Sequence, residues 1–415
     1  MSVVKNLPAL RAELDIMPSP VPDQPGLLVL DPFQYSDATV IIPPLLARGL
    51  AFFNGEHTEL DLRAELTRLT GELQTGEVAT HLAETLDKCG FVESATCFEM
   101  RDAKHREFAE ADVRKPAHAG SGYPAEPDEL VEKLNGYGAS IDSSSEDRLI
   151  GLAAPHVSPE GGYESYAAAY RRLRPEHADK TFVILGTSHY GQPEKFGLTR
   201  KPYETPLGAV ETDTGIVDWL EAQAPGSVQM EDYCHSSEHS IEFQSVFLQH
   251  VLRESLPESE RLRAVPILCG SFVESLLTGK PPDTSENNRR FFEALGELAE
   301  SKRDELVWIL GIDMAHIGRR YGDQFEAVAE EGQMSEVRVK DEARLRSVCA
   351  HDTSGFFEQV WPNRDELRWC GYSPVYTFLK SVGGWRGNVL NYEQWNIDEA
   401  SVVTFVGAEF VEEGD

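Results

Sequence analysis

The stretch Leu149-Ile150-Gly151-Leu152-Ala153-Ala154-Pro155-His156 is an apolar run that stops at a histidine. Residues 182–189 and 306–316 have the same form, since each apolar run passes into a short polar segment that ends in His189 or His316. An apolar run of about four to eight residues bounded by Gly or Pro is typical of a fully buried strand. Ligands of open α/β sheets bind beyond the carboxyl ends of the strands. The pattern therefore predicts that three imidazoles and the carboxylate of Asp313 converge at one edge of a sheet.

Apolar runs of strand length alternate with longer helical stretches from residue 116 onward. This alternation is typical of an α/β fold of the αβα kind, in which a mainly parallel sheet carries helices on both faces. The expected strands cover residues 149–154, 182–185, 262–268, 306–310, 389–392 and 402–408. The expected helices cover residues 163–173, 214–221, 240–253, 290–301 and 325–349.

The first part of the chain has a different pattern, which predicts an accessory domain at residues 1–110 and an α/β domain at residues 111–415. Thr58 is expected to cap a helix over 59–69, and a second helix over 78–89 is expected to end at Gly90. Two short segments that follow, residues 91–92 and 96–100, are expected to form a small β wing. Together with residues 53–58, this order resembles the PqqD-like winged-helix domains that recognise peptides. A purely structural accessory role is the alternative.

The composition excludes several classes of function. The formal net charge is −32, from 38 basic and 70 acidic side chains. Because phosphate contacts need clustered Lys and Arg, this charge argues against nucleic-acid binding. No apolar run is long enough to predict a membrane span, and residues 1–27 lack the pattern of a signal peptide. The six cysteines have no CxxC spacing, so we expect reduced thiols and a cytoplasmic chain.

Polar residues at the ends of the apolar runs are candidates for catalysis or metal binding. Pro155 stiffens the turn that presents His156. For His156 or His189 alone, a hydrogen-bonded structural role is the alternative. Asp313 and His316 stand three residues apart, so one helical turn would place them on the same face, where they could bind a metal or transfer a proton. Helix capping by Asp313 is the alternative.

Residues 235–242 are the densest polar cluster of the chain. Ser236 or Ser237 is expected to cap the helix that follows, which places Glu238 and Glu242 on one helix face. Burial of two like charges raises the pKa of at least one of them, which would suit a general acid or base. A solvated capping box is the alternative.

Cys370 lies between Trp369 and Gly371, in a segment expected to form a tight exposed turn before a helix from Val375. A thiolate near histidines is a good ligand for a soft metal ion. The N-terminus of a helix lowers the pKa of a nearby thiol. The alternative is a buried inert thiol, which is common for a free cysteine.

In their order, these motifs resemble the Memo family, the system protein B of AmmeMemoRadiSam gene sets. The matching phrases are residues 119–125, 154–156, 185–189, 238–242, 313–316, 370–371 and 391–392. The resemblance extends over about residues 116–410 and leaves the accessory domain outside. Residues 157–163 depart from the family pattern with a longer, stiffer loop, which predicts a pocket mouth of different shape.

The resemblance implies an αβα fold like that of the class III extradiol (LigB-like) non-haem iron dioxygenases. By position, it implies that His156, His189 and Cys370 bind a metal ion. A thiolate in the place of the dioxygenase carboxylate favours iron chemistry of another kind or copper, with zinc possible, over simple catechol cleavage. The polar residues that the resemblance places in the pocket are Asp313, His316 and His239. Glu238 remains a candidate acid or base from the cluster at residues 235–242.

Three functions follow as hypotheses. The first is a non-haem iron or copper redox enzyme of dioxygenase-like kind, acting on a small molecule or peptide in an AmmeMemoRadiSam-type pathway with radical-SAM and AMMECR-type partner proteins. The second is a peptide- or protein-binding partner with a vestigial dioxygenase pocket. The third is a zinc-dependent hydrolase with Glu238 or Asp313 as base, which the thiolate and the lack of HExxH-type spacing disfavour.

Overall fold

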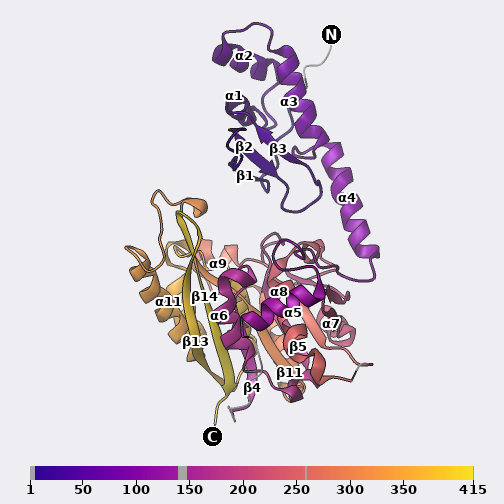
Figure 1. The fold of residues 1–415 in the computed structure, drawn as a ribbon, viewed down its shortest axis with the longest axis vertical. Coiled ribbons are helices and arrows are strands. Elements are labelled where there is room, and N and C mark those ends of the chain that lie inside the picture. Colours follow the sequence, from indigo (N-terminus) through magenta and orange to yellow (C-terminus); the bar gives the residue numbers. More distant parts are fainter. Residues whose placement is uncertain (1–4, 139–146, 258, 415) are drawn as a thin grey trace. The chain divides into compact units, whose positions relative to one another are not determined.

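The computed structural model of the chain describes residues 5–138, 147–257 and 259–414 (Figure 1). It divides into two compact units, Met1–Glu110 and Ala111–Asp415. Each unit has its own cluster of buried apolar side chains. Among the described residues, no helix combines the length and the apolar composition needed to cross a membrane.

The first unit contains a three-stranded antiparallel sheet that precedes its helices. The strand order is β1-β2-β3, with β1 at Asp15–Pro18, β2 at Leu27–Leu30 and β3 at Thr39–Ile42. The helices are α1 (Pro44–Ala47), α2 (Glu59–Thr70), α3 (Gly76–Lys88) and α4 (Ala95–Glu110). Thr58 caps α2 as predicted: its hydroxyl accepts the N–H of Asp61, whose carboxylate accepts the N–H of Thr58 at 2.8 Å.

The predicted β wing is wrong. Residues 96–100 lie within α4, and Val92 forms only an isolated bridge with Leu10. Ser94 stands directly before α4, and its hydroxyl accepts the N–H of Cys97 at 3.3 Å in the manner of a helix cap. All three strands come before the helices, so the helix, helix and hairpin order expected of a winged helix is absent from the described residues. A relationship to PqqD-like domains stays a prediction.

The second unit contains an 11-stranded mixed sheet. Its centre is four parallel strands in the order β4-β11-β5-β10. Every residue of β4, β5 and β11 is buried, which explains why their sequences are continuous apolar runs. The central strands are β4 (Leu149–Ala154), β5 (Thr181–Thr187), β10 (Arg263–Cys269) and β11 (Leu306–Gly311). The others are β6 (Phe196–Leu198), β7 (Tyr203–Thr205), β8 (Gly208–Thr212), β9 (Val228–Met230), β12 (Asp313–Gly318), β13 (Trp385–Asp398) and β14 (Ser401–Glu412).

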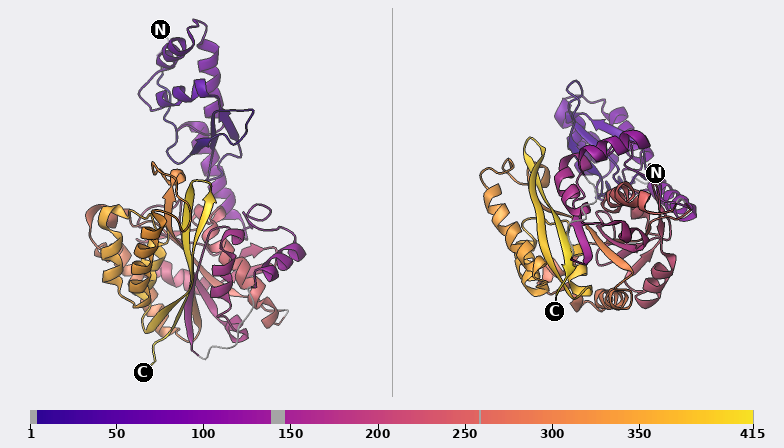
Figure 2. Two further views of the ribbon diagram at one scale, coloured as in Figure 1. Left: turned by 60° about the vertical axis from the view of Figure 1, so that its left-hand side comes forward. Right: turned by 60° about the horizontal axis from the view of Figure 1, so that its bottom comes forward.

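Helices cover both faces of this sheet, as the two views in Figure 2 show. On one face α6 and α8 pack together through the stacked rings of Tyr166 and Phe247, whose centroids are 4.2 Å apart. On the other face α13 packs on the central strands and α10 packs on α13. The helices of this unit are α5 (Pro127–Gly136), α6 (Pro159–Tyr170), α7 (Thr214–Gln223), α8 (His239–Leu252), α9 (Val273–Thr278), α10 (Glu286–Ser301), α11 (Met334–Cys349), α12 (Thr353–Val360) and α13 (Tyr372–Ser381).

The predicted α/β class, with a mainly parallel centre and helices on both faces, is confirmed. Several helix starts are wrong. The helices expected from residues 290 and 375 begin at Glu286 and Tyr372. The helix expected from residue 325 begins at Met334, because Glu330 and Gly332 have positive φ angles that interrupt a helix. The helix expected from residue 163 begins at Pro159, a residue that suits the first helical turn.

Asp313 and His316 do not lie on a helical turn, so the predicted helix and its cap by Asp313 are both wrong. The two residues belong to β12, which pairs antiparallel with β14 and has a register shift between them. At this irregularity the hydroxyl of Thr404 accepts the N–H of Ala315 at 2.8 Å. A spacing of three residues is compatible with a helical turn and with a strand. Only the pairing with β14, which is distant in the sequence, makes this segment a strand.

Gly186 and Gly311 allow α8 to approach the sheet closely. A Cβ atom on Gly311 would lie 2.2 Å from the carbonyl oxygen of Ser240, and one on Gly186 would lie 2.6 Å from its hydroxyl. Both glycines stand at the carboxyl ends of their strands. The first turn of α8 therefore lies beside the residues that follow β5 and β11.

We expect Gly311→Ala to destabilise the second unit by about 2 to 3 kcal/mol, because the added methyl group must displace α8. The midpoint of urea denaturation measures this. Gly136→Ala is the matched control, since no atom lies within 4 Å of its added Cβ. An unchanged midpoint for Gly311→Ala would contradict the close approach of α8.

Candidate metal centre

Three of the residues proposed from the sequence follow neighbouring strands of the sheet. His156 comes after β4, His189 after β5 and Asp313 after β11, and the strand order β4-β11-β5 brings these ends together. Cys370 comes from the segment before α13 instead. Its sulfur lies 3.2 Å from Nε2 of His156 and also forms a hydrogen bond with His189.

These side chains form two overlapping groups of candidate ligands. One group is His156, His189 and His239, and the other is His156, Asp313 and Cys370. Within each group the possible ligand atoms lie within 4.8 Å of one another. Imidazole, thiolate and carboxylate are the side chains that hold zinc, copper and iron in proteins. Since His156 belongs to both groups, the five side chains define one candidate metal centre.

Hydrogen bonds at Nδ1 orient the two histidines at the ends of β4 and β5. Nδ1 of His156 lies 2.9 Å from the carbonyl oxygen of Gly311, which can only accept. Nδ1 of His189 lies 3.1 Å from both carboxylate oxygens of Glu238. A ring that binds a metal must be neutral, and these contacts would then keep its proton on Nδ1 and leave the lone pair of Nε2 for the metal. Metal-binding histidines are oriented in this way by a carbonyl or a carboxylate. Without a metal, burial would lower the pKa of His189, but the charge of Glu238 and the hydrogen bonds to Cys370 and Glu238 outweigh burial and raise that pKa well above its ordinary value.

Glu238 is completely buried and caps α8. Its carboxylate accepts the backbone N–H groups of His189 at 3.0 Å, His239 at 2.9 Å and Ser240 at 3.1 Å. Burial alone would raise the pKa of Glu238, but the charge and the hydrogen bonds of His189 outweigh it and hold the pKa well below its ordinary value. The group stays ionised, which favours positioning of the imidazoles over proton transfer.

Two predictions for this cluster are wrong. Glu238 itself caps α8, in place of Ser236 or Ser237. The expected rise in pKa of Glu238 or Glu242 does not occur either, because each carboxylate faces hydrogen-bond donors and positive charge that outweigh the effect of burial. Glu238 precedes α8 as its cap, Glu242 lies in the first turn of the helix, and the two carboxylates have different partners.

The surroundings lower the pKa of Cys370 and raise the pKa of Asp313. Burial would raise the pKa of Cys370, but the interactions with His156 and His189 outweigh it and lower the pKa below the ordinary thiol value. Burial raises the pKa of Asp313 to about 6. Its Oδ2 lies 3.4 Å from Nε2 of His156, while Oδ1 accepts the N–H of His156 and of Val157. A carboxyl group that titrates near neutral pH beside a candidate ligand suits proton transfer.

His239 lies in the centre, whereas His316 lies outside both ligand groups. The ring of His239 stacks on that of His189 with centroids 5.0 Å apart, and its Nδ1 lies 3.2 Å from Oε1 of Glu238. Burial lowers the pKa of both His239 and His316. Nδ1 of His316 lies 2.9 Å from the carbonyl oxygen of Met314. Both imidazoles are therefore neutral near pH 7.

Arg114 holds the backbone at the start of α8, next to the candidate centre. It was not identified from the sequence as a functional residue. It is 1% exposed and donates to the carbonyl oxygens of Glu238 at 2.8 Å and His235 at 2.7 Å. It also forms a fully buried ion pair with Glu242, which accepts the backbone N–H of His118 as well. A single arginine separated from its partner by more than a hundred residues has no local pattern that marks it as buried.

The loop before Cys370 is held in an unfavourable conformation. Four non-glycine residues within 363–368 have φ angles of 55° to 58°, in the left-handed region that non-glycine residues avoid. Asp365, one of them, forms a buried ion pair with Arg344 at 2.7 Å and accepts the backbone N–H of Trp369 at 2.6 Å. This carboxylate therefore fixes the backbone directly before Cys370.

The comparisons with known proteins agree with these positions. The family model described as Memo-like protein matches residues 114–409, a range that contains all five candidate ligands. The chain belongs to the Memo family. A MEMO1 family protein of Thermococcus kodakarensis, TK1477, is 31% identical over 290 residues, which cover 68% of this chain and 92% of that protein.

A second relative extends the similarity beyond the Memo domain. A MEMO1 family protein of Aquifex aeolicus is 23% identical over 388 residues, which cover 92% of this chain and 95% of that protein. This match must include much of Met1–Glu110. Among solved structures, the uncharacterized protein JW3007 of Escherichia coli K12 aligns with a TM-score of 0.35 at 12% identity over 56% of this chain and 86% of that one. Such a score does not establish a common fold.

We expect Glu242→Gln to lower the free energy of unfolding at pH 7 by about 3 kcal/mol, since the pKa of Glu242 falls from 4.5 to about 2 in the folded chain. A depressed pKa stabilises the folded state above the unfolded pKa, and this stabilisation is lost as the pH falls from 4.5 toward 2. The gap between the wild type and the variant should therefore shrink over that range in denaturant titrations. The exposed Glu99→Gln is the control, and a gap that stays constant with pH would contradict the assignment.

We expect Asp365→Asn to release the backbone before Cys370, so that the thiol loses its contacts with the two histidines. The pH profile of Cys370 alkylation, followed by mass spectrometry of the labelled peptide, should shift toward that of an ordinary thiol. Asp352→Asn removes a helix cap at Gly355 and is the matched control. A variant that is less stable but keeps the wild-type profile would show that Asp365 does not position Cys370.

Proposed function

We propose that the chain is a metal-dependent redox enzyme in which His156, His189 and Cys370 bind an iron or copper ion. The observation that carries this proposal is that the Cys370 sulfur contacts two imidazoles. In both rings Nδ1 already forms a hydrogen bond, with the carbonyl oxygen of Gly311 or with Glu238. The donor set fits such an ion, because a thiolate with two imidazoles suits copper or iron better than magnesium or calcium. A bound ion of this kind would supply one-electron chemistry.

The residues around the proposed ligands have roles of their own. Asp313, with its pKa near 6, would accept or donate a proton beside His156. Neutral His239 stands next to His189 and would donate or accept a hydrogen bond to a substrate. Glu238 holds both His189 and His239 and would keep their orientation unchanged during turnover.

A small pocket beside the centre limits the size of the substrate. It has a volume of about 200 Å³, and its lining includes His189, Cys370 and the rings of Phe272, Trp369 and Tyr372. Typical pockets for drug-sized ligands start at about 300 Å³. The pocket therefore supports a small molecule, or one side chain of a peptide, as the substrate.

A zinc-dependent hydrolase is the second candidate. The raised pKa of Asp313 favours it, since a carboxyl group near neutral pH can act as a general base. The kind of metal that the purified chain retains separates the two functions. From the family resemblance alone, we also propose radical-SAM and AMMECR-type proteins as partners in an AmmeMemoRadiSam-type pathway.

Metal analysis of chain purified without chelator tests the proposal. We expect close to one iron or copper ion per chain in the wild type, and at least a tenfold loss in His156→Ala, His189→Ala and Cys370→Ala. His81→Ala, an exposed histidine on α3, is the control and should keep the metal. Retention of metal in His189→Ala would contradict the ligand set, and zinc as the retained metal would favour the hydrolase.

A further inference from the structure

Asp341 is a buried carboxylate on α11 that the proposed metal chemistry does not use. It accepts three hydrogen bonds, from Nε1 of Trp369 at 2.7 Å, from the hydroxyl of Thr404 at 2.7 Å and from the hydroxyl of Tyr392 at 2.9 Å. The three donors come from different parts of the chain. A single side chain therefore joins α11 to the loop before Cys370, to β14 and to β13.

A carboxylate buried among neutral donors is costly. None of the three donors carries a charge, and burial raises the pKa of Asp341 to about 6. Arg344, one turn further along α11, forms an ion pair with Asp365 instead. Oδ1 of Asp341 accepts from Trp369, while Oδ2 accepts from both hydroxyls. A carboxylate offers acceptors on both sides, whereas the amide of asparagine has a single acceptor oxygen, so the side chain suits a group that must hold donors on two sides.

The first of these hydrogen bonds fixes the segment that carries Cys370. Trp369 directly precedes Cys370, and its ring nitrogen donates to Asp341 while its backbone N–H donates to Asp365 at 2.6 Å. The guanidinium of Arg344 lies over the same ring, 5.3 Å from its centre. The residue before the proposed thiolate ligand is therefore held at its backbone, at its ring edge and at its ring face.

The second of these hydrogen bonds reaches the segment that carries Asp313. The hydroxyl of Thr404 donates to Asp341 and accepts the backbone N–H of Ala315 at 2.8 Å. Ala315 lies between Asp313 and His316, where the register of β12 shifts. Because a hydroxyl has one proton, a partner that only accepts determines the direction of both hydrogen bonds. Asp341 thus also fixes the irregular part of β12.

The two segments contact each other directly as well. The backbone N–H of Gly371 donates to the carbonyl oxygen of Asp313 at 3.0 Å. The backbone N–H of His316 donates to the carbonyl oxygen of Leu367 at 2.9 Å. The segment before α13 therefore runs alongside β12. Asp341 is bound to this segment directly and to β12 through one hydroxyl, so it holds the pair together.

We propose that Asp341 is a positioning residue that sets the placement of Cys370 and Asp313 relative to each other. This inference rests on the proposed function, in which Cys370 binds the metal ion and Asp313 transfers a proton. Among the described residues, Asp341 has no hydrogen bond of its own to either of them. It acts on the thiolate through Trp369 and on the carboxyl group through Thr404.

Titration of the metal-free full chain with Co²⁺ tests this inference, because the absorption of a Co²⁺–thiolate pair reports both affinity and ligand arrangement. Asp341→Asn should weaken Co²⁺ binding at least about fivefold and shift the thiolate band, since one acceptor oxygen cannot hold donors on both sides. Thr404→Val keeps the shape of the side chain and removes only the link to Ala315. It should weaken binding by a smaller factor.

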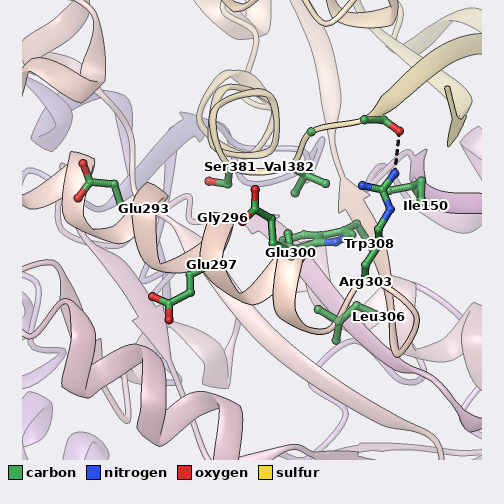
Figure 3. Close-up of a pocket in the computed structure, with 13 residues that line it drawn as sticks. Ile150, Glu293, Gly296, Glu297, Glu300, Arg303, Leu306, Trp308, Ser381 and Val382 are labelled. Carbon is green, nitrogen blue, oxygen red and sulfur yellow. Dashed lines mark hydrogen bonds between the residues drawn. The ribbon is translucent and has the colours of Figure 1, made fainter. Parts of the chain in front are cut away.

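Two control variants separate positioning from a general loss of stability. Glu409→Gln removes a buried carboxylate from the strand that carries Thr404, where it pairs with Arg172. Arg303→Gln removes a link between distant segments before β11, where the guanidinium donates to the carbonyl oxygen of Gly384 at 3.1 Å (Figure 3). Both controls should bind Co²⁺ as the wild type does, whatever their effect on the unfolding temperature.

Three outcomes overturn the inference. The first is an Asp341→Asn variant that unfolds at a lower temperature but binds Co²⁺ with wild-type affinity and spectrum, which would make Asp341 purely structural. The second is an equal loss of binding in Glu409→Gln. If Asp341→Asn does not fold, wild-type binding by Thr404→Val is the third. A wild-type chain without a Co²⁺–thiolate band would contradict the ligand set of the proposed function itself, and the inference would fall with it.

Discussion

The carboxylate of Glu238 is the group on which the geometry of the candidate centre depends. It is completely buried, it caps α8, and it accepts hydrogen bonds from the backbone and ring of His189. A buried carboxylate is costly unless it is paired. Here the imidazoles that compensate its charge are the same ones that it orients. Folding of α8 onto the sheet and orientation of His189 are therefore one interaction.

Much of this arrangement follows from the sequence for a clear physical reason. Parallel strands that are buried on both faces consist of continuous apolar residues, so β4, β5 and β11 are visible as runs. The point where each run turns polar marks the edge of the sheet where ligands bind. His156, His189 and Asp313 stand at such points and lie together in the structure.

The wrong predictions and the missed residues also have a clear physical reason, which is that they depend on partners distant in the sequence or on a single residue. The spacing of Asp313 and His316 fits a helix, and only pairing with β14, nearly a hundred residues away, makes the segment a strand. Arg114 and Asp365 hold the centre through partners that are distant in the sequence, Glu242 and Arg344. Neither has a local pattern. In the first unit, Ser94 accepts the N–H of Cys97 as a helix cap at the point where a wing was expected, and a single serine is a weak signal in a sequence.

The central claim is that two imidazoles and one thiolate bind a single metal ion. X-ray absorption spectroscopy of the metal-loaded chain tests it most directly, because sulfur and nitrogen ligands differ in distance and scattering. We expect one sulfur at about 2.3 Å and nitrogen ligands at about 2.0 to 2.1 Å, with the sulfur lost in Cys370→Ser. A ligand shell of nitrogen and oxygen alone in the wild type would contradict the account.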